Sequence, residues 1–428
     1  MIELPAEFLK RAKAELGGEY ADFLNSYNNP SVRGIRVNTL KISAEEFERL
    51  APVPLDGKVE WEPNGFYTPS ETPGKTIFHA AGLYYVQEPS AMCAAPELEV
   101  KRGERVLDLC SAPGGKGTQL AQAMQGEGVL VLNEIVPKRA EILRSNVERL
   151  GVKNALITST EPKRLAEVFK NYFDKILVDA PCSGEGMFKK EEAAIPEWSV
   201  QNVALCAERQ KEILDCAADM LSGGGRLVYS TCTFAPEEDE GQVERFLQAH
   251  TEFKLLSQKK LLPHKVRGEG HFCAVLEKTG GERRDISVIR PTVPDKKLLK
   301  VFEEWQRDTL LKKAENLVLR NYSFYSVADG TPDLSSTKIP HNFGVYLGKV
   351  SDDGKRFEPS HTLAMSLNRS EVKCVEVDEK TATAYLRGLT FDCEEKGWRV
   401  VTHKGFPLGW CKASGGLAKN HLPKGLRI

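Results

Sequence analysis

The sequence predicts an α/β fold, in which a doubly wound parallel sheet lies between a small N-terminal α+β domain and a mostly β C-terminal domain. Three observations carry this prediction. Strand and helix patterns alternate through the middle of the chain, a glycine-rich turn joins the first of these strands to a helix, and short strand patterns dominate beyond residue 305. The chain of 428 residues is long enough for two to three domains, which we expect at 1–80, 81–285 and 290–428.

The N-terminal segment is expected to form helices and then a strand. Phe8, Ala12 and Leu16 recur at helical spacing, and a glycine pair ends the pattern. The segment 33–38, RGIRVN, alternates apolar with basic or polar residues, as an edge strand does. Its polar face could be solvated or could contact an RNA backbone, and the pattern leaves both interpretations open.

The stretch 105–119, RVLDLCSAPGGKGTQ, predicts a buried strand, a tight turn and a helix that begins near Lys116. Glycines in the turn let the backbone approach a ligand closely, and the first amides of the helix can cradle a polar cofactor. The spacing matches neither the phosphate loop nor the G-x-G-x-x-G pattern. The turn therefore indicates another kind of cofactor pocket, although a turn of this type alone could be a simple connection.

Four more parallel strands are expected after this turn, at 130–132, 155–158, 173–179 and 226–230. Their carboxyl ends should meet at one edge of the sheet, where ligands of such folds bind. Glu134 follows the second strand about 20 residues past the turn, where a carboxylate would bind a ribose hydroxyl. A helix is expected to start within 236–240, whose acidic residues would favour its dipole.

Composition limits the class of protein. The net charge of −1 gives no overall nucleic-acid signature. The ten cysteines are scattered, without a C-x-x-C pair or zinc spacing, which favours reduced thiols and no metal site. Without a signal-peptide pattern or an apolar stretch of membrane-spanning length, we expect a cytoplasmic protein.

The C-terminal end is locally basic. From Lys396 to Ile428 there is no Asp or Glu, while lysines and arginines alternate with aromatic residues such as Trp398 and Trp410. This pattern is typical of a surface that binds an RNA backbone, although a solvated basic face without a partner would look the same.

Three motifs in this order resemble a known family: APGGK at 112–116, DAPCSGEGMF at 179–188 and YSTCTFAPEEDE at 229–240. The chain resembles the Sun-type RNA (cytosine-5) methyltransferases, and most closely the bacterial 16S ribosomal RNA m5C methyltransferases of the RsmF type. The resemblance implies a Rossmann-like catalytic domain that uses S-adenosyl-L-methionine and a PUA-like C-terminal domain that binds RNA. The target would be a single-stranded or flipped-out cytosine.

Methylation at cytosine C5 needs a nucleophile that adds to C6 and a group that helps remove the C5 proton. By resemblance, Cys232 is the nucleophile and Cys182 assists proton removal and release, although the sequence leaves the reverse order open. Asp179 would orient the cytosine or contact the cofactor, or merely cap its turn, and Lys116 would have a positioning role. The expected cofactor-binding residues are Cys110, Ser111, Ala112, Pro113, Gly114, Gly115, Lys116, Glu134, Asp179 and Glu161, with Thr160 as the alternative to Glu161.

Other functions stay open at this point. The same chemistry could act on transfer RNA, and a non-catalytic ribosome-assembly factor could share the RNA-binding flanks. The two intact cysteines argue against a pure binder. An N-methyltransferase is disfavoured because Asp179-Ala180-Pro181-Cys182 replaces the Asp/Asn-Pro-Pro-aromatic sequence of those enzymes. The sequence identifies neither the target cytosine nor the oligomeric state.

Overall fold

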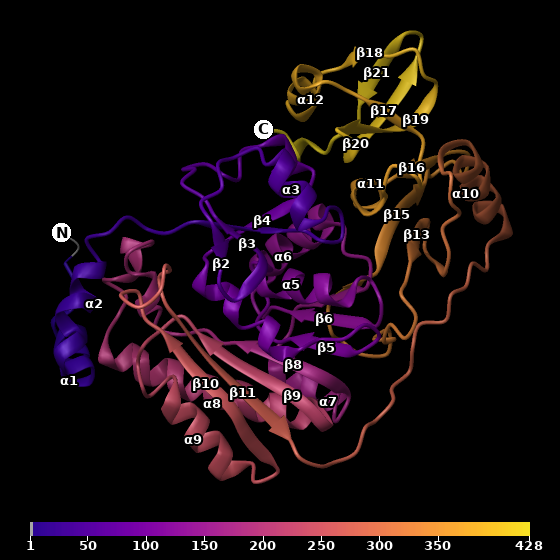
Figure 1. Cartoon of the computed structure of the whole chain (residues 1–428). Helices are drawn as coiled ribbons and strands as arrows, with labels where there is room; N and C mark the ends of the chain where they lie inside the picture. The colour runs from indigo at the N-terminus through magenta and orange to yellow at the C-terminus, as the bar shows by residue number, and fades with distance from the viewer. Residues whose placement is uncertain (1–2) are drawn as a thin grey trace.

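An eight-stranded sheet forms the centre of the molecule, in the computed structural model, which describes residues 3–428 (Figure 1). The strand order is β10-β11-β9-β8-β5-β6-β7-β14. The five expected strands are present and parallel: β5 (Arg105–Asp108), β6 (Val129–Asn133), β7 (Ala155–Thr158), β8 (Phe173–Asp179) and β9 (Leu221–Thr231). Three antiparallel strands extend it, β10 (Phe253–Leu261), β11 (His271–Lys278) and β14 (His341–Phe343). The predicted α/β class is confirmed.

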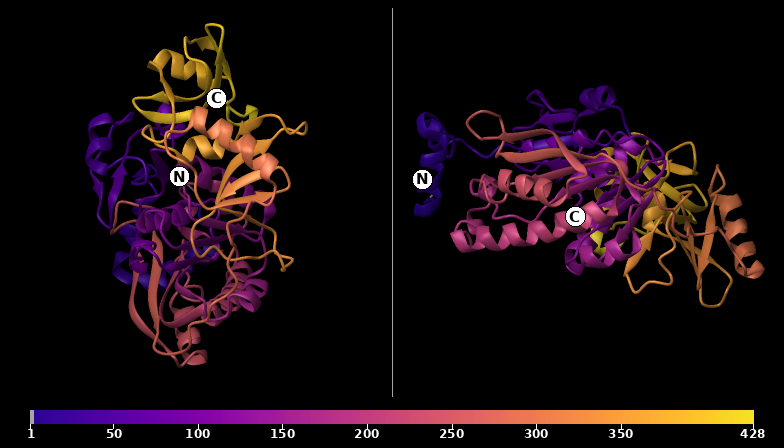
Figure 2. Two further views of the ribbon diagram at one scale, coloured as in Figure 1. Left: turned by 90° about the vertical axis from the view of Figure 1, so that its right-hand side faces the viewer. Right: turned by 90° about the horizontal axis from the view of Figure 1, so that it is seen from below.

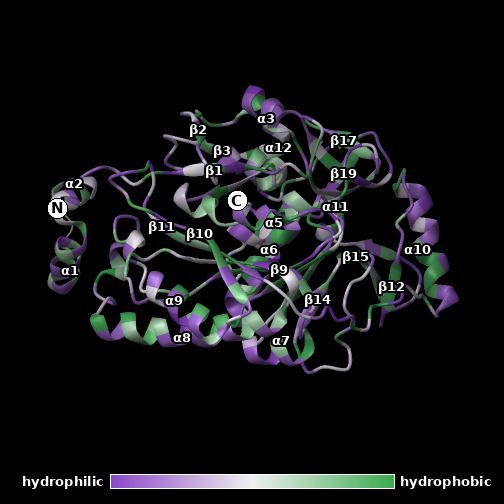
Figure 3. Cartoon of the chain, turned by 60° about the horizontal axis from the view of Figure 1, so that its bottom comes forward, coloured by the Kyte–Doolittle hydropathy of each residue, from purple (hydrophilic) through white to green (hydrophobic). Residues whose placement is uncertain are grey.

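Helices cover both faces of this sheet (Figure 2). Successive strand residues point to opposite faces, so Val106 packs with α5 and α6 whereas Leu107 packs with the layer that contains α7, α8 and α9. These helices are α5 (Gly115–Met124), α6 (Pro137–Leu150), α7 (Pro162–Val168), α8 (Val200–Met220) and α9 (Glu240–Ala249). The apolar residues of the strands accordingly lie between the helix layers (Figure 3).

The N-terminal part forms a second, four-stranded sheet of order β2-β3-β1-β4. Its elements are α1 (Ala6–Leu16), α2 (Tyr20–Ser26), β1 (Gly34–Val37), α3 (Ala44–Leu50), β2 (Lys58–Val59), β3 (Glu62–Tyr67), α4 (Ile77–Ala80) and β4 (Tyr84–Gln87). The prediction of an edge strand at 33–38 is wrong, because β1 pairs on both sides and is buried along its length. Arg36 is fully buried, so its side chain is available neither to solvent nor to RNA. Arg33 is exposed.

The C-terminal part contains two further sheets, visible at the upper right of Figure 1. The first has the order β12-β13-β15-β16 and the second β17-β19-β20-β21-β18. Their strands are β12 (Leu317–Arg320), β13 (Ser323–Ser326), β15 (Val345–Val350), β16 (Phe357–Pro359), β17 (Cys374–Glu376), β18 (Phe391–Asp392), β19 (Gly397–His403), β20 (Phe406–Ser414) and β21 (Leu417–Asn420). The helices are α10 (Lys296–Thr309), α11 (His361–Ser366) and α12 (Glu379–Leu386). Strand β14, from the same stretch of chain, pairs with β7 in the central sheet.

The basic end of the chain separates into buried aromatic and exposed basic residues. Trp410 is buried, and Trp398 packs against it with ring centroids 6.2 Å apart. The exposed basic residues are Lys396, Lys404, Lys412, Lys419, Lys424 and Arg427. The aromatic rings are therefore packing residues of this sheet, and the surface itself is cationic.

Helix α9 begins at Glu240, at the end of the expected range 236–240, and Glu240 is the acidic residue of its first turn. Glu238 and Asp239 are fully buried and form contacts elsewhere: Glu238 Oε2 accepts from Gln210 Nε2 at 2.8 Å, and Asp239 Oδ1 accepts from Thr231 Oγ1 at 2.6 Å. These carboxylates hold loops in place instead of favouring a helix dipole. In residues 3–428 no helix is long and apolar enough to cross a membrane.

Candidate active site

Three hydrogen bonds hold the turn after β5 against β6 and α6. Gly114 has a φ of +109°, which favours glycine, and α5 begins at the next residue. Ser111 N donates to Asn133 O at 2.8 Å, and Arg139 Nη2 donates to Ala112 O at 2.8 Å. Asn146 Nδ2 donates to Pro113 O at 2.9 Å. The predicted strand, turn and helix are thus present, with the turn tied to β6 and α6.

Arg36 links the N-terminal sheet to the same turn. Its Nη1 donates to Gly115 O and to Gln87 Oε1, both at 2.5 Å. Its other nitrogens donate to Thr118 Oγ1 at 2.8 Å and to Gln122 Oε1 at 3.1 Å. Burial lowers the pKa of Arg36 only to about 10, so the guanidinium is charged at neutral pH. The N-terminal sheet therefore fixes the position of the helix that follows the turn.

Asp108, which the sequence analysis did not single out, ends β5 directly behind the turn. It is fully buried, and its Oδ2 accepts from Ser111 Oγ at 2.8 Å. Its Oδ1 has no hydrogen-bond partner. Burial, together with the nearby charge of Asp179, raises the pKa of Asp108 to about 7. The position of Asp108 at the end of a strand, beside a glycine-rich turn, is the sequence feature that could have identified it as a site residue.

Gly117 lets α5 pack closely on this carboxylate. A Cβ at Gly117 would lie 2.5 Å from Ser111 Oγ and 2.9 Å from Asp108 Oδ2. Both distances are too short, so any larger residue would displace the two side chains. The glycine after Lys116 is therefore required for the geometry of the cradle.

The tip of β6 carries the expected carboxylate. Glu134 is buried, its Oε1 accepts from Val136 N at 2.9 Å, and its Oε2 lies 3.4 Å from Arg139 Nη1. At the next tip, Thr160 is buried and its backbone oxygen accepts from Asn133 Nδ2 at 3.0 Å. The side chain of Glu161 is exposed at the start of α7. Of the two residues offered for a third contact, the structure brings Thr160 to the strand tips.

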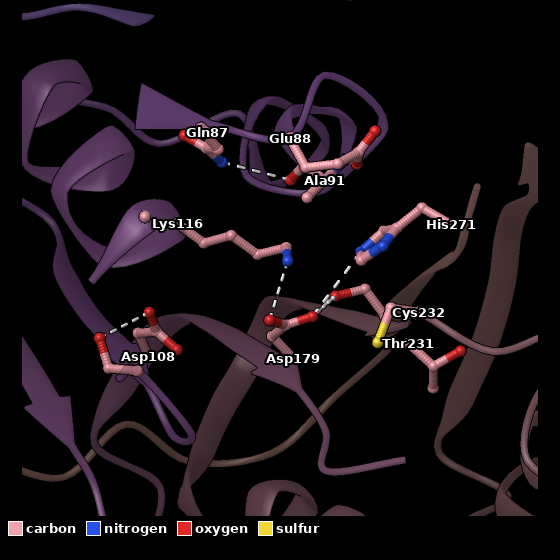
Figure 4. A network of polar contacts seen from close by, with 12 residues as sticks. Gln87, Glu88, Ala91, Asp108, Lys116, Asp179, Thr231, Cys232 and His271 are labelled. Atoms are coloured by element: carbon pink, nitrogen blue, oxygen red, sulfur yellow. Dashed lines mark hydrogen bonds and ion pairs between the residues drawn. The ribbon is translucent and has the colours of Figure 1, made fainter. Parts of the chain in front are cut away.

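A charged network lies across the tips of β5, β8 and β9 (Figure 4). Lys116 Nζ contacts Asp179 Oδ2 at 2.8 Å, and Ser230 Oγ donates to Asp179 Oδ1 at 2.8 Å. Burial alone would raise the pKa of Asp179, but Lys116 outweighs it and lowers that pKa. Burial likewise opposes the charge on Lys116, and Asp179 raises the pKa of Lys116 above its usual value. Both groups are therefore charged at neutral pH.

His271, the first residue of β11, completes this network and was missed by the sequence analysis. Its Nε2 lies 3.7 Å from Asp179 Oδ1, on the side opposite Lys116 in Figure 4. Burial and the charge of Lys116 lower the pKa of His271 to about 3. The imidazole is therefore uncharged at neutral pH. No motif in the sequence marked it, because only strand pairing brings it to this place.

The two candidate cysteines lie next to each other. Cys182 follows β8, Cys232 follows β9, and their Sγ atoms are 3.2 Å apart. The hydrogen bond to Cys232 and burial raise the pKa of Cys182 well above its usual value. The thiol of Cys182 is therefore protonated and can donate a hydrogen bond to the sulfur of Cys232.

The loops that carry these thiols are held rigidly. Gly186 N donates to Cys232 O at 2.8 Å, and Ser183 Oγ and Thr233 Oγ1 are 2.8 Å apart. The buried carboxylate of Glu185 accepts from Phe234 N at 3.1 Å and pairs with Arg11 of α1 at 2.6 Å. Helix α1 therefore supports these loops on the side away from the sheet.

The remaining expected residue, Cys110, follows β5 by two residues and packs against the core that contains Leu109 and Ala180. It is partly buried, and burial raises its pKa well above the usual value, so it is a neutral thiol. Within residues 3–428, no three His, Cys, Asp or Glu side chains are grouped as metal ligands would be. The site thus combines a cofactor cradle, a charged pair, a neutral imidazole and two adjacent thiols.

Four family models match the chain. They are the N-terminal domain of 16S rRNA methyltransferase RsmF at residues 4–89, 16S rRNA methyltransferase RsmB/F at 95–277, the RsmF rRNA methyltransferase first C-terminal domain at 304–367 and the methyltransferase RsmF PUA domain at 372–428. A curated relative, ribosomal RNA small subunit methyltransferase F from Shewanella oneidensis, is 31% identical over 472 residues, which cover 100% of this chain and 98% of the relative.

Solved structures resemble the chain as well. A methyltransferase homolog protein from Pyrococcus horikoshii is 29% identical with a TM-score of 0.55, over 64% of this chain and 100% of that one. NSun6 from Pyrococcus horikoshii, solved with SFG, has a TM-score of 0.58 at 23% identity, over 64% of this chain and 98% of that one. The second likeness concerns the fold alone.

Proposed function

The chain belongs to the RsmF-type 16S rRNA methyltransferases, which use S-adenosylmethionine, and on this basis we propose that it methylates C5 of a cytosine in small-subunit ribosomal RNA. One observation carries the choice of C5. Two thiols lie 3.2 Å apart beside a charged Lys116–Asp179 pair, at the strand tips where the cofactor cradle also lies. Methylation of an exocyclic nitrogen would need neither thiol.

Cytosine C5 is a weak nucleophile, so the ring must first be activated. We assign this step to Cys232, whose Sγ adds to C6 and forms a carbon–sulfur bond. The electrons of the C5–C6 double bond then become available for C5 to accept a methyl group. Loss of the C5 proton to a base and breakage of the carbon–sulfur bond restore the aromatic ring and the free thiol.

Cys182 is assigned to proton transfer and release. Its pKa is raised by Cys232 and by burial, so it holds its proton when the pair is at rest. A protonated neighbour at 3.2 Å supports Cys232 as the sulfur that reacts, because the hydrogen bond from Cys182 stabilises negative charge there. During release Cys182 donates this proton to the departing Cys232 sulfur, and the Cys182 thiolate that remains takes up the C5 proton, so that both thiols end in their starting state.

The cradle fits S-adenosylmethionine, which supplies a methyl group on a positively charged sulfur. The buried Asp108 Oδ1, which lacks a hydrogen-bond partner, suits the ammonium of the amino-acid part. Glu134 lies at the tip of the next strand, where a ribose would be bound. We assign the turn residues from Cys110 to Lys116 to the remaining cofactor contacts, with buried Thr160 rather than the exposed Glu161 side chain at the third strand tip.

The Lys116–Asp179 pair is assigned to the target base. A cation and a carboxylate held 2.8 Å apart can meet the acceptor and donor groups of a cytosine edge. Attack on C6 requires access to the face of the ring, so the cytosine must be single-stranded or flipped out. The six exposed lysines and arginines between Lys396 and Ile428 support contact with the surrounding RNA backbone.

Transfer RNA as a substrate, and a role without catalysis, are the alternatives that the experiment must separate. Purified protein is incubated with labelled S-adenosylmethionine and either unmodified small-subunit RNA, assembled subunits or transfer RNA, and the nucleosides are analysed. The proposal expects 5-methylcytidine in the small-subunit samples. Label in another nucleoside, label in transfer RNA alone, or stable RNA binding without transfer would each overturn it.

We further propose that the ranges 1–80, 81–285 and 290–428 act as RNA-binding, catalytic and RNA-binding units.

A further inference from the structure

His271 occupies a position that strand pairing makes part of the site. In the antiparallel pair of β11 and β9, Phe272 lies opposite Thr231. His271 is therefore level with Cys232, the residue after Thr231. It comes from a strand that carries no motif, yet it lies beside Asp179, as Figure 4 shows.

The imidazole of His271 is buried and unsatisfied. Only 1% of the residue is exposed, and neither Nδ1 nor Nε2 has a hydrogen-bond partner in the structure. By contrast, the buried ring of His403 has its Nδ1 3.0 Å from Val377 O. A buried polar group without a partner costs stability unless a ligand supplies the bond, so this ring is suited to contact something that enters the site.

The surroundings determine which hydrogen bonds this ring can form. Burial and the charge of Lys116 lower its pKa, so the ring is neutral, with one nitrogen that donates and one that accepts. Asp179 Oδ1, 3.7 Å from Nε2, is too far for a hydrogen bond but attracts a proton to Nε2. The lone pair then lies on Nδ1, which can only accept.

We propose that His271 is a specificity-determining residue whose free ring nitrogen accepts a hydrogen bond from the 4-amino group of the target cytosine. This inference rests on the proposed function and deepens it. Cytosine carries an amino donor at position 4, where uracil carries a carbonyl acceptor. Asp179 and the neutral His271 together present acceptors to this edge, which suits cytosine and disfavours uracil.

The test removes the amino group from the RNA and the imidazole from the protein. A single-stranded RNA around the target, located by mapping the product, carries either cytosine or pyrimidin-2-one, which lacks the amino group. Both RNAs are titrated against proteins that carry Cys232→Ala, so that no covalent bond forms. Loss of the amino group is expected to weaken binding by the protein with His271 about tenfold more than it weakens binding by His271→Phe. This difference corresponds to one uncharged hydrogen bond.

Matched variants separate contact from folding. His271→Asn keeps an acceptor near the position of Nδ1 and should retain most of the tenfold effect, whereas His271→Leu, a smaller apolar residue than phenylalanine, should behave as His271→Phe does. S-adenosylmethionine affinity should be unchanged in all three. If removal of the amino group weakens RNA binding equally with and without the imidazole, the role assigned to His271 is overturned, while the proposed function stands. Failure of the unmodified protein to produce 5-methylcytidine would instead overturn the proposed function, and this inference with it.

Discussion

The Sγ atoms of Cys182 and Cys232 lie 3.2 Å apart, although the two residues are 50 positions apart in the sequence. Strands β8 and β9 are parallel neighbours, with Asp179 opposite Ser230, so their loops leave the sheet side by side. The hydrogen bond to Cys232 and burial raise the pKa of Cys182, so this thiol keeps its proton at neutral pH. Its proton lies within hydrogen-bond distance of the Cys232 sulfur.

Substitution of each cysteine should give opposite results on a denaturing gel. With S-adenosylmethionine and unmodified small-subunit RNA, Cys182→Ala should accumulate a covalent protein–RNA adduct, because release is blocked. Cys232→Ala should form no adduct and lose at least about 10⁴-fold in methyl transfer. An adduct found only with Cys232→Ala would reverse the two roles, and Cys206→Ala, on α8, serves as the control with normal turnover.

Lys116 and Asp179 should depend on each other. Lys116→Met leaves the carboxylate of Asp179 without its cation at 2.8 Å, so we expect a loss of about 100-fold in activity and roughly 2 kcal/mol in the free energy of unfolding. Denaturant titration should show that Asp179→Asn added to Lys116→Met restores part of the stability but no activity. Strictly additive losses of stability would contradict the coupling.

Arg36 should be a structural residue and Arg33 should not. Arg36→Met removes the buried hydrogen bonds to Gly115, Gln87 and Thr118, and should lower the free energy of unfolding by roughly 3 kcal/mol. Because Gly115 begins α5, the affinity for S-adenosylmethionine should fall as well. Arg33→Ala, three residues earlier and exposed, should leave both quantities unchanged.

Binding of S-adenosylmethionine should depend on pH through Asp108. Its pKa is about 7 in the free protein, since burial disfavours the charge, so the carboxylate takes up a proton as the pH falls through 7. A neutral Asp108 attracts the cofactor ammonium less, and calorimetry should show a rising Kd from pH 8 to pH 6, with proton release on binding at the lower pH. Asp108→Asn should bind more weakly, with a Kd that is flat over this range.

The same carboxyl group should affect stability in the opposite direction. An unfolded Asp has a pKa of 3.8, whereas folded Asp108 has a pKa of about 7, so the folded state binds the proton more tightly between these values. This stabilisation is fully present below pH 3.8 and is lost as the pH rises through about 7. Relative to Asp108→Asn, the protein without ligand should therefore become less stable from pH 5 to pH 8 in denaturant titrations.

Close packing at Gly117 gives a further test of the cradle. In Gly117→Ala the new methyl group would lie 2.5 Å from Ser111 Oγ, so the hydrogen bond from Ser111 to Asp108 must shift. We expect S-adenosylmethionine affinity to fall about tenfold or more. Gly18→Ala, where no atom lies within 4 Å of the added Cβ, is the matched control and should bind normally.

Elements that depend on neighbouring residues could be predicted from the sequence alone. The apolar residues within 106–110 and 173–179 predicted strands of the sheet, and the glycine turn predicted where α5 begins, because strand burial and turn geometry depend on consecutive residues. The order of the motifs identified the family. The strands predicted directly before two of these motifs placed Cys182 and Cys232 at strand tips. These predictions needed no knowledge of long-range contacts.

Contacts between residues that are distant in the sequence became apparent in the folded chain. Arg36 looked like part of a polar strand face, but pairing of β1 with β3 and β4 buries it against α5. His271 entered the site because β11 pairs with β9, and β14 completed the central sheet from a segment expected elsewhere. Local patterns encode which face of an element is apolar, whereas burial of a charge or an imidazole depends on the partners that the assembled chain supplies.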